Sequence, residues 1–428
     1  MKWADGILRY RPGALARGSL HTMGVFGIRL VTQVALLFLL ARYLGAADFG
    51  DYAAIAALAI LLGAVSTLGV GFLVLIDTSK DAEHGLESYK KVLPLTLISA
   101  CLLLPLYLLL SLFVIKTSTG STVLVFIGLS ELIAMPLLMV QAKRLQGLGR
   151  AAHGQLLLTV PLVARLLLLG IFANLLPDGG LLVFSFIHVT TSFLALGLGN
   201  ILAGNGLLGG VVWASPDFRR VQKGLPYALM RLASLGPGEV DKTIAPRLLG
   251  STEAGSYAMA TRGVAVATLP IIALMHAVQP RILALSTKKH PAAGKLIAIV
   301  LVGTLAYGIT ISGLFYTVAP PVFLYLLGPE FAAAADILTL LALIAPLIAL
   351  RVATGGLLIA FEMPWQRTII EATGTMILLT IAVLSAPALS VVGFVLAIGV
   401  SETIMVLGFS ATMVLHQTKM AKHAREST

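Results

Sequence analysis

The chain has 428 residues, of which 58% are hydrophobic and only 11% are charged, and its formal net charge is +11. Together with a mean hydropathy of +0.97, this composition excludes a water-soluble enzyme or binding domain and predicts a polytopic membrane protein. The single cysteine, Cys101, lies in an apolar run, which excludes a disulfide framework and a cysteine metal cluster. We expect no metal and no cofactor.

Twelve apolar runs follow one another along the chain, and each is long enough for a helix to cross a hydrocarbon core of about 30 Å. The runs are continuous rather than alternating apolar and polar, which favours helices over the strands of a membrane barrel. The first six are expected at residues 21–43, 52–76, 92–115, 121–142, 154–175 and 181–203. The second six are expected at residues 225–249, 256–280, 295–318, 332–361, 368–386 and 390–416. The predicted fold is an all-α polytopic membrane protein with an N-terminal lobe, residues 1–210, and a C-terminal lobe, residues 211–428.

Positive charge is distributed very unevenly between the two sets of loops. One side carries 21 of the 30 lysines and arginines, whereas the other carries only Arg42, Lys116 and Arg247. Because lysine and arginine are retained in the cytoplasm, both termini are expected there, with the basic loops against anionic lipids. The basic residues are dispersed and belong to no recognisable nucleic-acid-binding module, so no nucleic-acid partner is expected.

A short polar connection occurs twice. "RYLGAADFGDYA" spans Arg42–Ala53, "RLLGSTEAGSYA" spans Arg247–Ala258, and an offset of 205 positions aligns Gly45 with Gly250. Both copies follow the first span of a six-span half, so the pattern predicts an internal duplication with the halves in parallel orientation. We expect each glycine to end its helix in the left-handed conformation. The role is interpreted as architectural, and a cargo contact by the arginine that opens each copy is the alternative.

Two longer stretches carry a family resemblance. "VDKTIAPRLLGSTEAGSYAMATR", Val240–Arg262, and "LYLLGPEFAAAADILTLLALIAP", Leu324–Pro346, resemble the seventh-to-eighth and tenth helix signatures of Wzx-type polysaccharide flippases. With "LGAADFGDYA" the resemblance covers nearly the whole chain. It implies the fold of the multidrug/oligosaccharidyl-lipid/polysaccharide exporter superfamily, with two six-helix lobes around a central cavity, in the bacterial inner membrane. The motifs specify the fold better than the cargo.

Ionisable residues inside the spans are costly and usually face a cavity or a partner. We expect Glu131 to pair with Arg165 on a neighbouring span. Arg351, Glu371 and Glu402 lie in the last three spans and are expected to pair within the C-terminal lobe.

The spans that line the cavity in the resembling fold carry an excess of positive charge. Four cations, Arg29, Arg231, Lys242 and Arg262, stand against two acids, Glu239 and Asp241. A diphosphate needs several cationic donors, and arginine can bind it bidentately, so these cations are the candidate cargo contacts. Gln33 shares a helix face with Arg29 and joins them. His276 shares a face with Arg262, but we interpret it as a satisfied interior residue.

The segment "SLGPGEVDK" places Gly236, Pro237 and Gly238 inside the seventh span, where a kink is expected. In the functional interpretation the helix bends to open the cavity while Asp241, Glu239 or both exchange a proton or sodium ion. The alternative is a static kink with Asp241 bonded to Lys242 or a nearby backbone group.

Three functions are candidates for a chain with these features. The resemblance implies a flippase that moves undecaprenyl-diphosphate-linked oligosaccharide across the membrane, with a polysaccharide polymerase and other assembly proteins as candidate partners. A multidrug cation antiporter of the same superfamily would need a cavity dominated by carboxylates and aromatic residues. A membrane enzyme would need a large catalytic loop, and direct ATP use would need a P-loop; the sequence shows neither. We therefore expect a monomeric, ion-coupled transporter that is not an enzyme.

Overall fold

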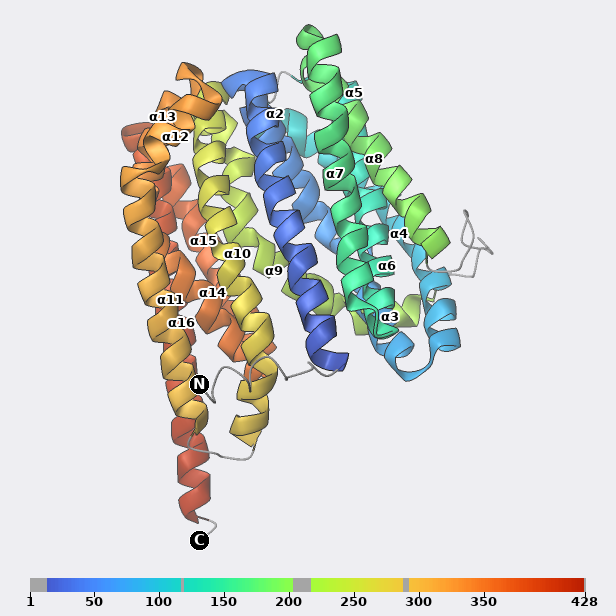
Figure 1. Ribbon diagram of the computed structural model, residues 1–428, viewed down its shortest axis with the longest axis vertical. Helices are drawn as coiled ribbons and strands as arrows, with labels where there is room; N and C mark the ends of the chain where they lie inside the picture. Colours follow the sequence, from blue (N-terminus) through green and yellow to red (C-terminus); the bar gives the residue numbers. More distant parts are fainter. Residues whose placement is uncertain (1–13, 117–118, 203–216, 288–291, 427–428) are drawn as a thin grey trace, which may run out of the picture.

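The computed structural model describes residues 14–116, 119–202, 217–287 and 292–426, and the described residues contain helices and no strands. The helices pack lengthwise against one another (Figure 1). The first half contains α2 (Ala14–Ser66), α3 (Val70–Lys80), α4 (Ala82–Leu110), α5 (Ser121–Leu129), α6 (Met135–Gly147), α7 (Ala151–Leu175) and α8 (Gly180–Leu202). The second half contains α9 (Phe218–Leu249), α10 (Ser251–Thr287), α11 (Ala292–Thr317), α12 (Ala319–Leu327), α13 (Ala332–Ala342), α14 (Ala345–Ala360), α15 (Pro364–Leu389) and α16 (Val391–Glu426). The predicted lobe boundary at 210/211 lies outside the described residues.

The polytopic all-α prediction is confirmed. Among the described residues, nine helices are long and apolar enough to cross a membrane, or ten if the bent pair Pro329–Ala342 and Ala345–Ala360 forms one span. One of them, Gly27–Ser66, is divided at Gly45 by non-helical backbone. The remaining expected span is α9, which is not among these helices because it contains too many charged residues. The bend of 60° in the pair interrupts the tenth span, which the sequence predicts as continuous.

The two ends of the bundle differ. We call the end where α2 begins and α16 ends the termini end, and the opposite end, with the Gly45 and Gly250 turns, the turn end (Figure 1). Gly45 has φ 72° and ψ 172°, and Gly250 has φ 85° and ψ 158°. The two turns therefore share one backbone conformation, as expected for repeated segments. It is not the predicted left-handed helical region, but an extended region with positive φ that only glycine adopts readily.

At the turn end the two halves touch through a second pair of repeated glycines, Gly50 and Gly255. A Cβ atom on Gly50 would lie 2.1 Å from the carbonyl oxygen of Ser251, and one on Gly255 would lie 1.9 Å from that of Ala46. The Ser251 hydroxyl also donates a 2.7 Å hydrogen bond to Oδ1 of Asp51. The backbones of α2 and α10 meet here with no room for side chains.

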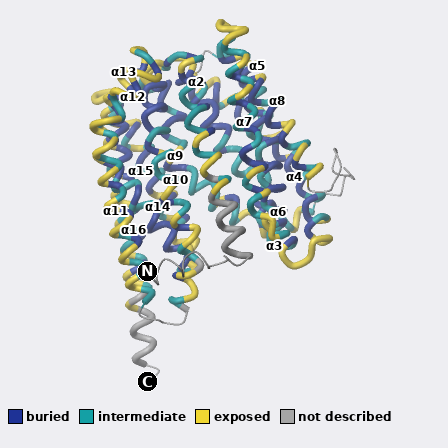
Figure 2. Tube along the Cα trace, in the orientation of Figure 1, coloured by how far each residue is buried: buried dark blue, intermediate teal, exposed yellow. Residues whose placement is uncertain are grey.

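Apolar packing also differs between the turn end and the termini end. The largest buried cluster combines residues of both halves, including Phe49 and Phe184 from the first and Tyr257 and Phe331 from the second. Toward the termini end each half has its own cluster, one around Phe409 and others in the first half. Buried residues accordingly occupy the interior of the bundle (Figure 2). The halves thus share one large apolar cluster at the turn end, whereas toward the termini end they have separate clusters and meet through the start of α9.

One expected span is broken. The chain is predicted to be helical through 52–76, but α2 ends at Ser66 and α3 begins at Val70, with positive φ at Leu68 (51°) and Gly69 (71°). A Cβ atom on Gly69 would lie 1.9 Å from the carbonyl oxygen of Gly224 in α9. The break allows the two backbones to approach, and non-helical backbone at membrane depth is tolerated because it is buried in protein.

The glycine contact at the turn end predicts a strong response to one methyl group. We expect Gly50→Ala to destabilise the protein by about 1 to 3 kcal/mol, because the added atom overpacks a backbone contact. In the matched control Gly303→Ala, the added Cβ meets nothing within 4 Å, so stability should be unchanged or slightly higher. Thermal unfolding of the purified proteins measures both. Equal effects of the two substitutions would contradict the contact.

Candidate functional site

A cavity of about 670 Å³ lies between the two halves, toward the termini end. It falls within the size range of ligand sites in proteins, roughly 300 to 1,000 Å³. Side chains of α2, α6, α7, α9 and α10 line it, so both halves contribute to its wall. Its polar lining residues are Arg29, Gln33, Lys143, Gln146, Gln155, Arg231 and His276.

The cavity is basic. Arg29 of α2, Lys143 of α6 and Arg231 of α9 line it, whereas no aspartate or glutamate is among the described lining residues. None of these three cations forms a salt bridge within the part of the chain that the structure describes. All three side chains are partly buried. Uncompensated cations in a partly desolvated space favour an anionic ligand.

The predicted contact residues divide into two groups. The structure brings Arg29, Gln33 and Arg231 together in this cavity. His276 also lines it and is exposed, so its interpretation as a satisfied interior residue is wrong. The residues of α10 that line the cavity, from Leu269 and Pro270 to His276, lie along one face of that helix.

Lys242 and Arg262, the other predicted contacts, lie against acids. Lys242 Nζ is 3.3 Å from Oδ1 of Asp241 and donates to the carbonyl oxygen of Gly238. Arg262 lies 3.6 Å from Oε2 of Glu239. Neither lines the large cavity. The two predicted ion-coupling residues therefore each hold one of the predicted cargo cations.

Asp241 has a second partner, since the hydroxyl of Tyr257 in α10 donates to its Oδ2. Asp241, Lys242 and Tyr257 are buried. Asp241 and Lys242 lie within one turn after Gly238, and α9 continues as a helix through Gly236, Pro237 and Gly238. Asp241 thus joins α9 to α10 just beyond the glycine and proline residues where a kink is predicted.

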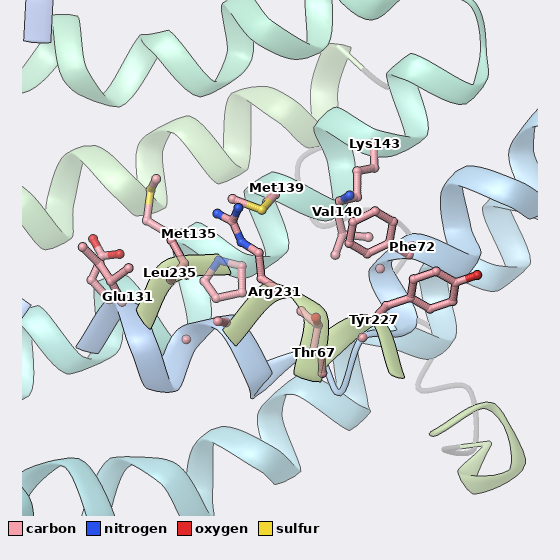
Figure 3. Close-up of a pocket in the computed structure, with 17 residues that line it drawn as sticks. Thr67, Phe72, Glu131, Met135, Met139, Val140, Lys143, Tyr227, Arg231 and Leu235 are labelled. Atoms are coloured by element: carbon pink, nitrogen blue, oxygen red, sulfur yellow. The ribbon is translucent and has the colours of Figure 1, made fainter. Parts of the chain in front are cut away.

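A smaller pocket of about 150 Å³ adjoins the cavity between α2, α3, α6 and α9. The two spaces share Met139, Lys143 and Arg231. Figure 3 shows Arg231 beside Met139 near the middle of this pocket and Glu131 at one end. Apart from Arg231, Lys143 and Glu131 its lining is mostly apolar, and Arg231 stands where the apolar and the basic spaces meet.

Lys143 is the functional candidate that the sequence prediction missed, since its position near a span end suggested a loop charge. Its Nζ lies 3.1 Å from the centre of the Phe72 ring, and Phe72 stacks on Tyr227 of α9 with centroids 5.2 Å apart. A signal does exist in the sequence. Glu131, Met135, Met139 and Lys143 recur every fourth residue, which places them on one side of a helix, and all four line the smaller pocket.

The expected Glu131–Arg165 ion pair is wrong. Glu131 instead lies 2.8 Å from Nε2 of His188, while the Arg165 guanidinium donates to the hydroxyls of Thr191 (3.2 Å) and Ser192 (2.6 Å). Both charges are therefore satisfied by α8, which the sequence does not mark as their partner. In the second half, pairing is confirmed between Arg351 and Glu402, at 2.6 Å. Glu371 pairs with Arg367, at 2.9 Å, and accepts from Ser234.

Comparison with known proteins gives the fold. No family model and no curated protein matches the sequence. An inward-facing multidrug resistance MATE family transporter of the MOP superfamily superposes with a TM-score of 0.71 at 14% identity, over 94% of this chain and 99% of that one. The MATE multidrug transporter DinF-BH gives 0.66 at 17% identity, over 95% of both chains. An outward-facing MATE family transporter gives 0.60 at 15% identity, over 94% of this chain and 95% of that one.

The chain has the MATE fold. At these identities the likeness shows the architecture alone, and the cargo has to be argued from the side chains. Among the described residues, no group of three or more histidine, cysteine, aspartate or glutamate side chains is placed to hold a metal ion.

Within this MATE fold, substitutions can test whether the Arg351–Glu402 ion pair stabilises the protein. Arg351→Met leaves Glu402, which is 3% exposed, without its partner, and we expect a loss of about 3 to 5 kcal/mol of stability. The double variant Arg351→Met/Glu402→Gln removes both charges and should recover most of the loss. Unfolding of the single and double variants measures the difference. Additive losses would show that the two residues do not act as a pair.

Proposed function

We propose that this protein is an alternating-access transporter that moves a polyprenyl-diphosphate-linked oligosaccharide across the bacterial inner membrane. The observation that carries the proposal is the large cavity, on which Arg29, Arg231 and Lys143 converge while no carboxylate is among the described lining residues. A cavity of this charge attracts an anion and repels a cation.

The chemistry of a diphosphate ester fits the cavity. Two adjacent phosphates spread their charge over several oxygens, and each arginine can donate two parallel hydrogen bonds to such oxygens. Gln33, Gln146 and Gln155 provide amide donors and acceptors for the hydroxyl groups of a sugar attached to the diphosphate. The head of a lipid-linked glycan therefore has a partner for its charge and for its hydroxyls.

The direction of transport follows from charge placement. The termini end carries most of the basic loops, which supports a cytoplasmic position for that end. The cavity lies toward that end, where cargo would be loaded, while the Gly50–Gly255 contact holds the turn end together. Release on the far side requires this contact to separate. One chain supplies both walls of the cavity, so we propose that the monomer is the working unit.

Ion coupling is proposed for Asp241 and Glu239. Asp241 links α9 to α10 through Tyr257, and Glu239 faces Arg262 across the same two helices. Binding a proton or sodium ion would weaken both contacts, because a neutralised carboxylate is a weaker acceptor for the Tyr257 hydroxyl and attracts the Arg262 cation less. The ion gradient would then drive the movement of α9 relative to α10.

A multidrug antiporter is the second candidate function. The observation that favours it is the smaller pocket, where Glu131 accompanies Met135 and Met139. Adaptable methionine side chains beside an acid would suit a lipophilic cation. Against this, Glu131 is already engaged by His188, and Arg231 and Lys143 line the same pocket. Binding of an organic dye cation that competes with neither pyrophosphate nor prenyl diphosphate would support this alternative.

Neutralising either arginine tests the anion site. We expect Arg29→Ala and Arg231→Ala each to lower the affinity for diphosphate roughly ten- to a hundredfold, since one charge-assisted contact contributes about 1.5 to 3 kcal/mol. Lysine replacements should restore affinity only partly, because lysine lacks the planar fork. Isothermal titration with inorganic pyrophosphate measures binding, and cytoplasmic accumulation of lipid-linked oligosaccharide measures transport.

The control for these variants is Arg219→Ala, because Arg219 is exposed near the start of α9 and outside the cavity. It should bind pyrophosphate as the parent does. Normal binding and transport by both Arg29→Ala and Arg231→Ala, at matched membrane levels, would exclude a diphosphate site in this cavity.

Ion coupling has a separate test. Asp241→Asn and Glu239→Gln should leave pyrophosphate binding within a few-fold of the parent, because neither acid lines the cavity, but should abolish transport driven by a proton or sodium gradient. Transport into vesicles with an imposed gradient measures this, and retained folding is checked by thermal unfolding. If both single variants and the double variant keep gradient-driven transport, the two acids serve only as partners of Arg262 and Lys242.

A further inference from the structure

We propose that Lys143 is a third cation of the diphosphate site, and that on cargo binding its ammonium moves from the Phe72 ring to the anion and thereby weakens one contact between α9 and the first half. The inference rests on the proposed function, because it assumes an anionic cargo. It assigns Lys143 a movement on cargo binding and links the occupied site to the position of α9.

The position of Lys143 carries the first step. Lys143 and Arg231 both line the large cavity and the smaller pocket, so an anion held by Arg231 lies within the same space as Lys143. Lys143 has no acidic partner within salt-bridge distance among the described residues. Its described contact is with the face of Phe72, 3.1 Å from the ring centroid. Its charge is held beside the cavity by a neutral group.

The relative strength of two interactions carries the second step. An ammonium over an aromatic ring is attracted by the ring quadrupole, whereas a phosphate oxygen offers a full negative charge and accepts a charge-assisted hydrogen bond. A diphosphate that reaches Arg231 therefore competes with the Phe72 ring for the Lys143 ammonium and binds it more strongly. Phe72 then loses the cation that covers one of its faces.

Phe72 connects this exchange to α9. Its ring stacks on Tyr227 of α9 at an interplanar angle of 17°, and Figure 3 shows Lys143, Phe72 and Tyr227 in succession at one end of the smaller pocket. Because Lys143 lies on α6, the stack joins three elements. Loss of the cation weakens the contact that α9 makes with the first half.

The rest of α9 shows why this contact matters. Near its start α9 contacts the first half, through Gly224 against Gly69 and through Arg220, which donates to Asp77 and Ser88. Around Gly236 it contacts α15 of the second half, where a Cβ atom on Gly236 would lie 2.5 Å from Oγ1 of Thr375, and at its end Arg247 donates to carbonyl oxygens of the first half again. Gly236, Pro237 and Gly238 separate the first part of α9 from the second. Weakening one contact of the first part favours a bend of α9 at that segment.

The test uses the full chain in phosphatidylcholine nanodiscs, with Cys101 replaced by serine and spin labels at Glu87→Cys on α4 and Gln222→Cys on α9, both exposed positions. Pulsed electron paramagnetic resonance measures the distance between the labels, and titration calorimetry measures affinity. The probes are inorganic pyrophosphate and farnesyl diphosphate, which separate a free anion from a lipid headgroup. In the parent, both probes should shift the population to longer distances.

Two variants, Lys143→Met and Phe72→Leu, should then differ in pyrophosphate affinity. A lysine with only a structural role would not produce this difference. Lys143→Met should show the long distance without any probe and bind pyrophosphate ten- to a hundredfold more weakly. Phe72→Leu should also show the long distance without a probe, but bind pyrophosphate as tightly as the parent or more tightly, because Lys143 is no longer held by the ring. Lys143→Arg should behave nearly as the parent. Lys80→Met, at an exposed lysine on α3, should change neither measurement.

The outcomes distinguish this inference from the function on which it rests. If Arg29→Ala and Arg231→Ala weaken pyrophosphate binding while Lys143→Met binds within twofold of the parent, the anion site stands and the role of Lys143 is refuted. The same holds if neither probe changes the distance in the parent. If the parent binds neither probe, both the inference and the proposed function fall.

Discussion

The backbone contact between Gly50 and Gly255 is the constraint on which the rest of the structure depends. These two residues occupy equivalent places in the two repeats, and their lack of side chains lets α2 and α10 meet directly. Because the halves are joined at the turn end, the large apolar cluster forms across both of them there. Toward the termini end the apolar clusters belong to one half each, the start of α9 keeps contact with the first half, and the basic cavity lies between the halves. A contact of a few atoms thus determines where a ligand can bind.

The charges inside the bundle obey a simple division. Those within one half or beyond the cavity have partners: His188 for Glu131, Glu402 for Arg351 and Asp241 for Lys242. Arg29, Lys143 and Arg231, which line the large cavity, form no salt bridge among the described residues. An isolated charge in a membrane protein is costly to maintain, so a group of unpaired cations at one place is better explained by a ligand that completes it than by folding.

The sequence predicts the spans and the repeat well, because both depend on features local to the chain: the length of an apolar run, and the glycine at a sharp turn. It also identifies Arg29 and Arg231 as ionisable residues at membrane depth. It does not show which face of a helix meets which neighbour. Glu131 is therefore assigned to Arg165 rather than to His188, and Lys143 is assigned to a loop although its helix continues beyond the apolar run. The break before α3 is equally hidden, since it depends on Gly224, far away in sequence.

That break has a consequence for the symmetry of the molecule. The repeat offset that aligns Gly45 with Gly250 aligns Gly69 with Leu274, which lies within the continuous helix α10 and is 40% exposed. Segments at equivalent places of the two repeats therefore have different structures, a break before α3 in one and the continuous helix α10 in the other. A movement that pivots at the break in the first half has no equivalent break at Leu274 in the second.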